Sequence, residues 1–230
     1  MKILLTGSSG PKVASRVAAI LALNHEVTGV DMTAAPTTTI VADITRVDDW
    51  QRHLQGIDAV IHFAALHAPH RETHSAEEFR ATNVDSTRRL LDAEQLCRDA
   101  FSPSFSTAAL RFSRCFPEPT PLMALYRLYR GVDARDVAEA FSLSLTAHFA
   151  QFEAINISGE TPFQQDDCER LRLDASEVLR LRAPELVEEF SRRQWPLPAS
   201  IDRVYVIEKA KALLGYRPRF GFRELLNKNA

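Results

Sequence analysis

The 230-residue sequence has few cysteines and no apolar stretch that approaches the ~20 residues of a membrane-spanning helix. Its 3 cysteines, Cys97, Cys115 and Cys168, form neither a CxxC pair nor an even-numbered disulfide framework. The apolar run at the N-terminus passes straight into a glycine turn, which indicates a strand rather than a signal peptide. These absences predict a cytoplasmic protein with free thiols and no membrane partner.

An excess of charge of one sign is also missing. The 28 Lys and Arg residues nearly balance the 30 Asp and Glu residues, and the basic side chains are scattered among acids. No basic stripe is present to bind nucleic acid. The length suits one domain, or one domain with a small appendage, and the 45% hydrophobic content is ordinary for a globular protein.

Apolar segments with strand and helix spacing alternate through the first hundred residues. The expected strands are Lys2–Leu5, Glu26–Asp31, Thr39–Ile44 and Ala59–Ala65, and the expected helices are Val13–Leu23, Val47–Leu54 and Ser75–Cys97. This alternation predicts an α/β fold, a Rossmann-like doubly wound parallel sheet with right-handed crossovers. The continuous apolar run of Ala59–Ala65 is typical of a strand buried on both faces.

The remaining chain is less regular. The expected elements are a strand at Thr107–Ser113, an irregular proline-rich segment at Phe116–Pro121, a helix at Asp133–Ala147 and a short strand at Ala154–Ser158. From Thr161 onward the chain is charged and helical in patches. We expect a shortened nucleotide-binding domain over residues 1–115 and a smaller substrate-binding or cap region over residues 116–230, interleaved with the sheet.

A glycine turn, Gly7-Ser8-Ser9-Gly10, stands where the first strand meets the first helix. Backbone N–H groups and the positive end of a helix can hold a pyrophosphate there, and glycine permits its close approach. Asp31 ends the second strand 24 residues after Gly7, the spacing at which an acid binds an adenosine ribose. Its charge would repel a 2′-phosphate, so NAD is favoured over NADP. The alternative is an ordinary turn residue at the end of a strand.

The third glycine of such a motif is absent. Val13 occupies its position, after Pro11 and Lys12. We expect the valine to push the helix from the strand or to narrow the phosphate pocket. Lys12 either offsets this by pairing with phosphate or is an ordinary exposed lysine.

These features resemble the extended short-chain dehydrogenase/reductases, the NAD-dependent epimerase/dehydratase family, which acts largely on nucleotide sugars. The N-terminal matches are the glycine turn with Asp31, the pair Asp43-Ile44, the strand Val60–Ala65 and the helix motif Asn83-Val84-Asp85-Ser86-Thr87, with Ser86 in place of glycine. The later matches are Leu110-Arg111-Phe112, Val132–Ala138, Asp202, Lys209-Ala210 and Leu214–Pro218. The resemblance covers most of the chain, and its motifs are specific only together.

The resemblance implies an NAD-dependent oxidoreductase or isomerase that acts on a small polar substrate such as a nucleotide sugar. Members of the family form homodimers through the two helices that flank the missing segment, so the alternatives here are a homodimer, a changed dimer or a monomer. The cofactor-binding residues that it implies are Gly7, Ser8, Ser9, Gly10, Asp31, Asp43, Ile44, Phe63, Ala64, Ala65 and Asn83.

The catalytic segment of that family has no counterpart here. Its Ser or Thr and its Tyr-x-x-x-Lys lie between the helix with Asn83 and the strand with Leu110, and this interval is too short in the present sequence. An internal deletion is expected to have removed them with the fifth strand. Thr107–Ser113 should then pair beside Ala59–Ala65, which gives the strand order 3-2-1-4 followed by that strand.

Several residues are candidates to replace the missing catalytic groups. Ser106 and Thr107 carry hydroxyls, although such residues before a strand are more often turn residues. His67 and His70 are candidates to face a substrate, and no metal is expected without cysteine or paired carboxylate ligands. Tyr205 and Lys209 spell Y-x-x-x-K far from the expected place, so a structural role is expected for Tyr205.

Two further groups each have two interpretations. Tyr126, Arg127, Tyr129 and Arg130 suit a sugar-nucleotide phosphate or belong to a surface helix with extended arginines. Asp166 and Asp167 form a carboxylate pair or are merely solvated. Function likewise stays open between an enzyme of the family with another acid or base and a non-catalytic NAD-binding or protein-interaction module. Nucleotide binding without turnover would distinguish the second from the first.

Overall fold

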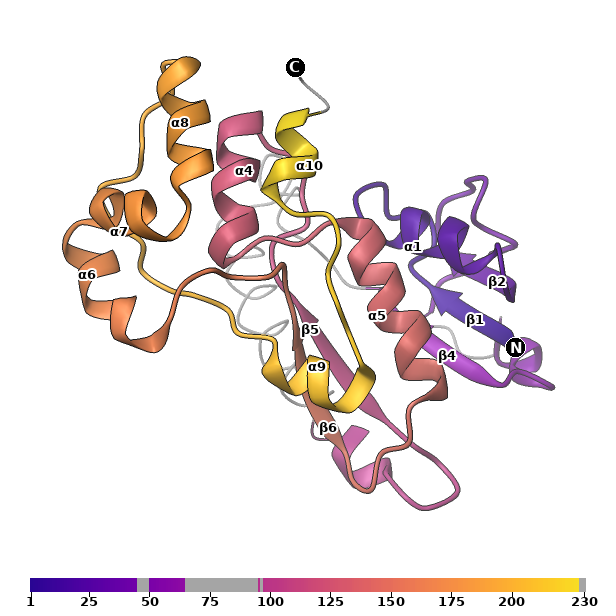
Figure 1. Ribbon diagram of the computed structural model, residues 1–230. Helices are drawn as coiled ribbons and strands as arrows, with labels where there is room; N and C mark the ends of the chain where they lie inside the picture. Colours follow the sequence, from indigo (N-terminus) through magenta and orange to yellow (C-terminus); the bar gives the residue numbers. More distant parts are fainter. Residues whose placement is uncertain (45–49, 65–94, 96, 228–230) are drawn as a thin grey trace, which may run out of the picture. The chain divides into compact units, whose positions relative to one another are not determined.

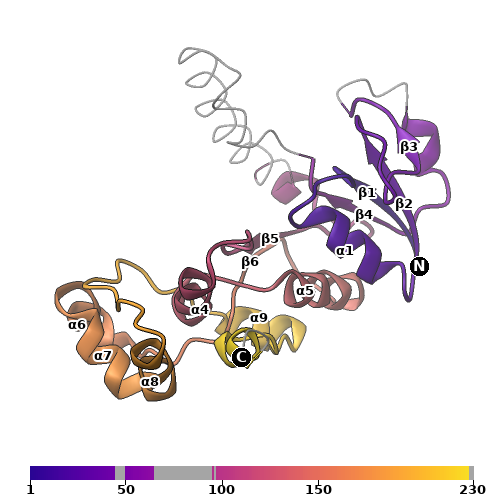
Figure 2. The same cartoon turned by 90° about the horizontal axis from the view of Figure 1, so that it is seen from above.

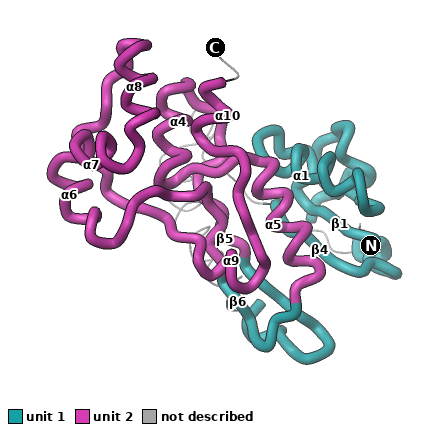
Figure 3. The backbone as a smooth tube through the Cα atoms, in the orientation of Figure 1, with its two compact units in different colours: residues 1–109, 148–154 teal, residues 110–147, 155–230 magenta. Residues whose placement is uncertain are grey.

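The computed structural model describes residues 1–44, 50–64, 95 and 97–227. The chain divides into two compact units (Figure 3). Unit 1 contains residues 1–109 and 148–154, and unit 2 contains residues 110–147 and 155–230. Each unit is therefore built from two separate stretches of chain.

Unit 1 holds a parallel sheet whose strands are β1 (Lys2–Thr6), β2 (Glu26–Asp31), β3 (Ile40–Val41) and β4 (Ala59–His62). Their order is β3-β2-β1-β4, with β1 in the middle paired to both β2 and β4 (Figure 2). Helix α1 (Ala14–Leu21) follows β1 and packs on β2. The predicted Rossmann-like α/β class is confirmed.

The sheet is smaller and less enclosed than expected. The third strand is 2 residues long, and the helix expected to follow it is described only as the single 3-10 turn η1 (Gln51–Leu54). In β4, Ile61 is 4% exposed but Val60 is 52% exposed. Among the described residues the predicted burial on both faces is therefore not met at Val60; most of the expected helix Ser75–Cys97 lies outside them.

The pairing predicted for Thr107–Ser113, beside Ala59–Ala65, is also wrong. Strand β5 (Ala108–Phe112) pairs with β6 (Glu153–Ile157) in a separate two-stranded sheet, and among the described residues β4 is an edge of its own sheet. Every strand presents the same backbone donors and acceptors to a neighbour, so apolar alternation indicates a buried face and leaves the partner open. Ile155 and Ile157 of the partner strand β6 are buried.

Unit 2 is mainly helical (Figure 1). Its helices are α4 (Thr120–Tyr129), α5 (Ala134–Thr146), α6 (Cys168–Leu173), α7 (Ala175–Arg182), α8 (Pro184–Arg192), α9 (Glu208–Leu214) and α10 (Phe222–Asn227), with the short turn η3 (Gln165–Asp167) before α6. Helices α6, α7 and α8 pack in series, α10 packs on α4, and α9 packs on α5. A shared apolar core joins α4, α6, α7, α8 and α10, and it includes Leu128, Leu171, Leu179, Leu186 and Phe190.

Local sequence explains where these helices begin. The Asp133 side chain accepts the Arg135 N–H at 3.0 Å and caps α5, which confirms the helix predicted there. Pro184 lies in the first turn of α8, where a missing N–H removes no helical bond. Pro121 likewise lies in the first turn of α4, which begins at Thr120. The prediction that the irregular segment extends to Pro121 is therefore wrong for its last two residues.

Within residues 1–44, 50–64, 95 and 97–227, no helix is both long and apolar enough to cross a membrane. The same residues contain no group of three or more His, Cys, Asp or Glu side chains arranged to hold a metal ion.

Candidate cofactor site

The glycine turn connects β1 to α1 and touches the chain that leaves β4. Gly7 has a φ of 73°, a conformation that side chains rarely adopt. A Cβ atom built on Gly7 would lie 2.6 Å from the nitrogen of Ala64 and 2.9 Å from the carbonyl carbon of Phe63. Both neighbours are backbone atoms, so only glycine permits this contact between the ends of two parallel strands.

The four backbone N–H groups of residues 7–10 all donate within the protein. The first two reach the carbonyl of Val30 at 2.8 and 3.3 Å, the N–H of Ser9 reaches Asp31 Oδ2 at 3.0 Å, and that of Gly10 reaches the carbonyl of Gly7 at 3.1 Å. The expectation that this turn presents N–H groups to a pyrophosphate therefore needs a refinement. A diphosphate would displace the carboxylate of Asp31 from Ser9 or use the first turn of α1.

Asp31 lies at the end of β2 and faces the glycine turn. Its carboxylate accepts the Ser9 N–H at 3.0 Å and the Thr33 N–H at 3.0 Å. Partial burial raises the pKa of Asp31, but the hydrogen bonds from Thr33 and Ser9 outweigh it and leave the pKa below its usual value. The group is thus an anion at neutral pH, beside the turn, as the spacing from Gly7 indicated.

A run of threonines after β2 holds the glycine turn, and sequence reasoning missed it. The Thr37 hydroxyl donates to the carbonyl of Ser8 at 2.6 Å, and the hydroxyls of Thr38 and Ser8 lie 3.1 Å apart. Ser8 is fully buried beneath this contact. The sequence feature that could have indicated this contact is the run of three threonines, Thr37–Thr39, in the chain after Asp31.

Thr6 was missed as well. Its hydroxyl lies 2.7 Å from Nδ1 of His62 and accepts the Ala64 N–H at 3.4 Å, which ties the end of β1 to the end of β4. Partial burial of the imidazole lowers the pKa of His62. A neutral imidazole can form one hydrogen bond with the Thr6 hydroxyl, as donor or acceptor according to its tautomer.

The other expected cofactor residues occupy the ends of neighbouring strands. Asp43 and Ile44 follow β3, and the indole N–H of Trp50 donates to the carbonyl of Ile44 at 3.1 Å. Phe63 and Ala64 follow β4. The expected residues Ala65, Asn83, His67 and His70 lie outside the described residues.

Val13 is buried and directly precedes α1, which begins at Ala14. The helix therefore begins one residue after the position of the missing third glycine. No side chain caps its first turn.

The hydroxyl candidates lie in a local turn. Thr107 Oγ1 donates to the carbonyl of Cys97 at 2.5 Å, and Ser106 is exposed. Tyr205 precedes α9, whereas Lys209 lies within it, and the Tyr205 N–H donates to the carbonyl of Tyr129 at 2.8 Å. The two therefore do not share one helical face in the way that a catalytic Tyr-x-x-x-Lys requires.

The two ambiguous charged groups are both engaged in unit 2. Arg127 is 10% exposed and bonds Asp133 at 2.9 Å, so a surface helix with extended arginines is the wrong description for it. Asp167 is 3% exposed and bonds Arg182 at 2.9 Å, so it is not simply solvated.

The N-terminal part of the chain is similar in sequence to known proteins. Residues 3–108 match the NAD dependent epimerase/dehydratase family. A 3-beta-hydroxysteroid dehydrogenase of Mycolicibacterium neoaurum is 34% identical over 104 residues, which is 41% of this chain and 28% of that protein. The chain thus spans little more than a quarter of the length of this curated relative.

Solved structures match over nearly the whole chain. The UDP-glucuronic acid 4-epimerase of Bacillus cereus, in complex with UDP-glucuronic acid and NAD, has a TM-score of 0.56 at 18% identity, covering 99% of this chain and 97% of that one. The UDP-glucose 4-epimerase of Bifidobacterium longum, with NAD+ and UDP, has a TM-score of 0.61 at 15% identity, covering 98% and 96%. At these identities the likeness establishes the fold.

The parallel sheet, the glycine turn at the end of β1 and the acid at the end of β2 agree with the family match. Residues 3–108 of this chain therefore resemble the NAD-dependent epimerase/dehydratase family in sequence and in the arrangement of the glycine turn and Asp31.

Proposed function

We propose that the chain binds NAD at the carboxyl edge of the unit 1 sheet. The observation that carries this proposal is the close approach at Gly7, where a Cβ atom would meet the backbone of Ala64 at 2.6 Å. This approach sets the glycine turn against the chain that leaves β4, at the carboxyl ends of the parallel strands where such sheets bind nucleotides, and Asp31 stands beside the turn. Asp43, Ile44 and Phe63 extend the proposed set, together with Ala65 and Asn83, which lie outside the described residues.

NAD, when bound, supplies hydride transfer, and the protein supplies its position and electrostatics. Asp31 is the group that would accept the ribose hydroxyls, because its anionic form is favoured by the N–H groups around it. A 2′-phosphate at the same place would meet a like charge, at a cost of about 1–4 kcal/mol depending on exposure to water. Preference for NAD over NADP follows.

Calorimetric titration with each dinucleotide tests the proposal. The wild type should bind NAD more tightly than NADP. Asp31→Asn should weaken NAD binding about tenfold, because a charge-assisted hydrogen bond is lost, and the affinities for NAD and NADP should become more similar. Asp58→Asn is the matched control: Asp58 accepts the N–H of Lys2 at the opposite end of the strands. No saturable binding of either dinucleotide would refute the proposal.

The proposed substrate is a small polar molecule of the nucleotide-sugar class, held with the help of residues 116–230. This rests on the folds of nucleotide-sugar epimerases, which resemble the chain over nearly its full length. Incubation with UDP-glucose or UDP-glucuronic acid and NAD, followed by NMR of the sugar anomeric protons, tests it. Conversion to the 4-epimer would support an epimerase-type enzyme.

A non-catalytic NAD-binding module is the second candidate, and one observation favours it. Within the described parts of the chain, no Tyr and Lys stand one turn apart on a helix, since Tyr205 lies before α9 and Lys209 within it. The hydroxyl of Thr107 is engaged with a backbone carbonyl. NAD binding without conversion of either sugar nucleotide would support this second function and an ancestral loss of the catalytic segment.

A further inference from the structure

Unit 2 contains a cavity of its own, of about 670 Å³. It lies among α4, the loop after β6, the start of α8 and the segment that leads into α10. This volume is within the range of small-molecule sites. Its apolar lining consists of Leu128, Pro162, Pro184, Pro218 and Phe222. None of its lining residues belongs to the proposed NAD site.

The charged lining of this cavity is dominated by arginine. The cationic side chains are Arg127, Arg182, Arg219 and Arg223, and the acidic ones are Glu160, Glu185 and Glu224. Each acid already has a cation partner: Glu160 bonds Lys211, Glu185 bonds Arg223 and Glu224 bonds Arg135. The negative charges of the wall are therefore offset within the protein. Arg182 and Arg223 are likewise offset, by Asp167 and Glu185, which leaves Arg127 and Arg219 as the cations to consider.

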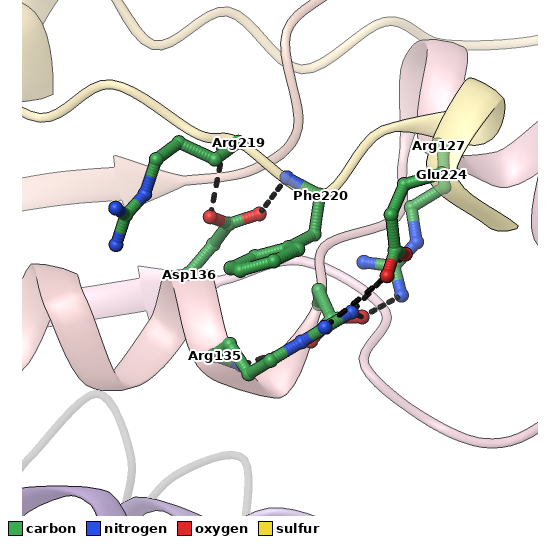
Figure 4. Close-up of polar contacts among 7 residues, drawn as sticks. Arg127, Arg135, Asp136, Arg219, Phe220 and Glu224 are labelled. Carbon is green, nitrogen blue, oxygen red and sulfur yellow. Dashed lines mark hydrogen bonds and ion pairs between the residues drawn. The ribbon is translucent and has the colours of Figure 1, made fainter.

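Arg127 has bonding capacity left over. Its Nη2 bonds Asp133 Oδ2 at 2.9 Å, and the same carboxylate also bonds Arg135 Nε at 2.8 Å, so two guanidinium groups share one acid (Figure 4). Arg127 Nη1 is buried and has no hydrogen-bond partner. A buried donor on a charged group is strongly stabilised by any acceptor brought to it.

The start of α8 also borders the cavity, through Ala183, Pro184 and Glu185. Pro184 has no N–H, and the N–H groups of Leu186 and Val187 donate to the carbonyl of Ala183 at 3.1 and 3.2 Å. This turn therefore adds little for an anion, and the arginines are the groups that would bind it.

Arg219 gives the cavity an accessible cation. Its side chain is 67% exposed, and its contact with Glu139 is long, at 3.7 Å. A guanidinium held this loosely can turn toward a new acceptor at little cost. Its backbone N–H donates to Asp136 at 2.9 Å, so the main chain beneath the side chain stays fixed.

We propose that this cavity binds a small molecule that carries an oxyanion, a carboxylate or a phosphate, on an apolar body. The exposed Arg219 contacts the anion after its side chain turns from Glu139 toward the cavity, because Figure 4 shows its guanidinium directed away from Arg127. Arg127 Nη1 takes the anion's second contact when a wall side chain shifts, since this atom is enclosed in the free protein. Leu128 and Phe222 cover the apolar body. The site is separate from the NAD site and does not depend on it.

Phenyl phosphate and benzoate are suitable probes, because one carries a phosphate and the other a carboxylate on the same apolar group, a phenyl ring. Each is titrated calorimetrically into the full chain and into three variants. Arg219→Ala removes the exposed cation and keeps the backbone bond to Asp136. Arg127→Met keeps most of the stem and removes the guanidinium. Arg180→Ala is the control, since Arg180 is an exposed arginine of α7 that does not line the cavity.

The expected result is saturable binding of at least one probe, weakened about tenfold by Arg219→Ala through loss of a charge-assisted hydrogen bond and unchanged in Arg180→Ala. Which probe binds identifies phosphate or carboxylate as the anion. Circular dichroism checks that each variant is folded, and Arg219→Ala carries the test if Arg127→Met is not. Absence of binding by both probes would overturn the proposal. So would equal weakening by Arg180→Ala, or binding that Arg219→Ala leaves unchanged.

Discussion

Gly7→Ala gives the sharpest test of how the cofactor edge of unit 1 is built. Two separable effects oppose an alanine at this position. Its φ of 73° lies in the left-handed region, and the added Cβ would lie 2.6 Å from the nitrogen of Ala64. Gly56 separates the two effects, because its φ is 76° and nothing lies within 4 Å of a Cβ built on it.

The magnitudes follow from these geometries. A left-handed conformation costs an L-residue about 1–2 kcal/mol, and that is all Gly56→Ala should lose. Forcing a methyl group against fixed backbone adds about 1–3 kcal/mol, so Gly7→Ala should lose about 2–5 kcal/mol in total. Such a loss is a large part of the stability of an ordinary domain.

Urea unfolding measures the difference. Trp50 and Trp195 are the 2 tryptophans, and Trp50 belongs to unit 1. In a Trp195→Phe background, fluorescence therefore follows unit 1 alone. Gly7→Ala should unfold at clearly lower urea than Gly56→Ala and should also lose NAD binding. Equal shifts in the two variants would refute the close approach as the reason for glycine at position 7.

Three further outcomes are expected. Tyr216→Phe should lower the stability of unit 2 by about 1–2 kcal/mol in thermal unfolding, because the buried hydroxyl donates to the carbonyl of Ser158 at 3.0 Å; an unchanged melting temperature would contradict this. Asp167→Asn should cost about 1–3 kcal/mol by breaking the half-buried pair with Arg182, with urea unfolding followed at Trp195 as the measurement and no change as the contrary result. The lowered pKa of Asp31 stabilises folded unit 1 at any pH above the pKa of an unfolded aspartate, about 3.9, and this stabilisation is lost as the pH falls through the lower pKa of the folded state. In Asp31→Asn the urea midpoint should therefore depend less on pH in this acidic range. Plots of urea midpoint against pH that run parallel for the wild type and Asp31→Asn would refute this.

Local features of both units could be predicted from the sequence. Strand β2 ends at Asp31 as expected, and α5 lies within the helix predicted from Asp133. The glycine turn was found because its residues are consecutive and its conformation is fixed by glycine itself. Each of these depends on contacts between near neighbours in the chain, which periodicity and capping residues record.

Other features could not be predicted, because they depend on distant residues. The partner of β5 is β6, more than 40 residues further along, and nothing in the pattern of Ala108–Phe112 distinguishes it from β4. Arg127 becomes buried only because Asp133 faces it from beyond the end of its own helix. The threonine hydroxyls on Ser8 likewise need the chain to fold back after β2 before they have a function.

The discontinuous make-up of both units also bears on how the chain acquires its structure during synthesis. Unit 1 needs residues 148–154, which bring the buried Phe149 and Phe152, the latter under the guanidinium of Arg98 at 4.7 Å. Unit 2 needs the backbone N–H of Phe220, which Asp136 accepts at 3.1 Å. A nascent chain would thus begin unit 2 before unit 1 is complete, and the two would mature together rather than in turn. A product cut after residue 115 would contain neither finished unit.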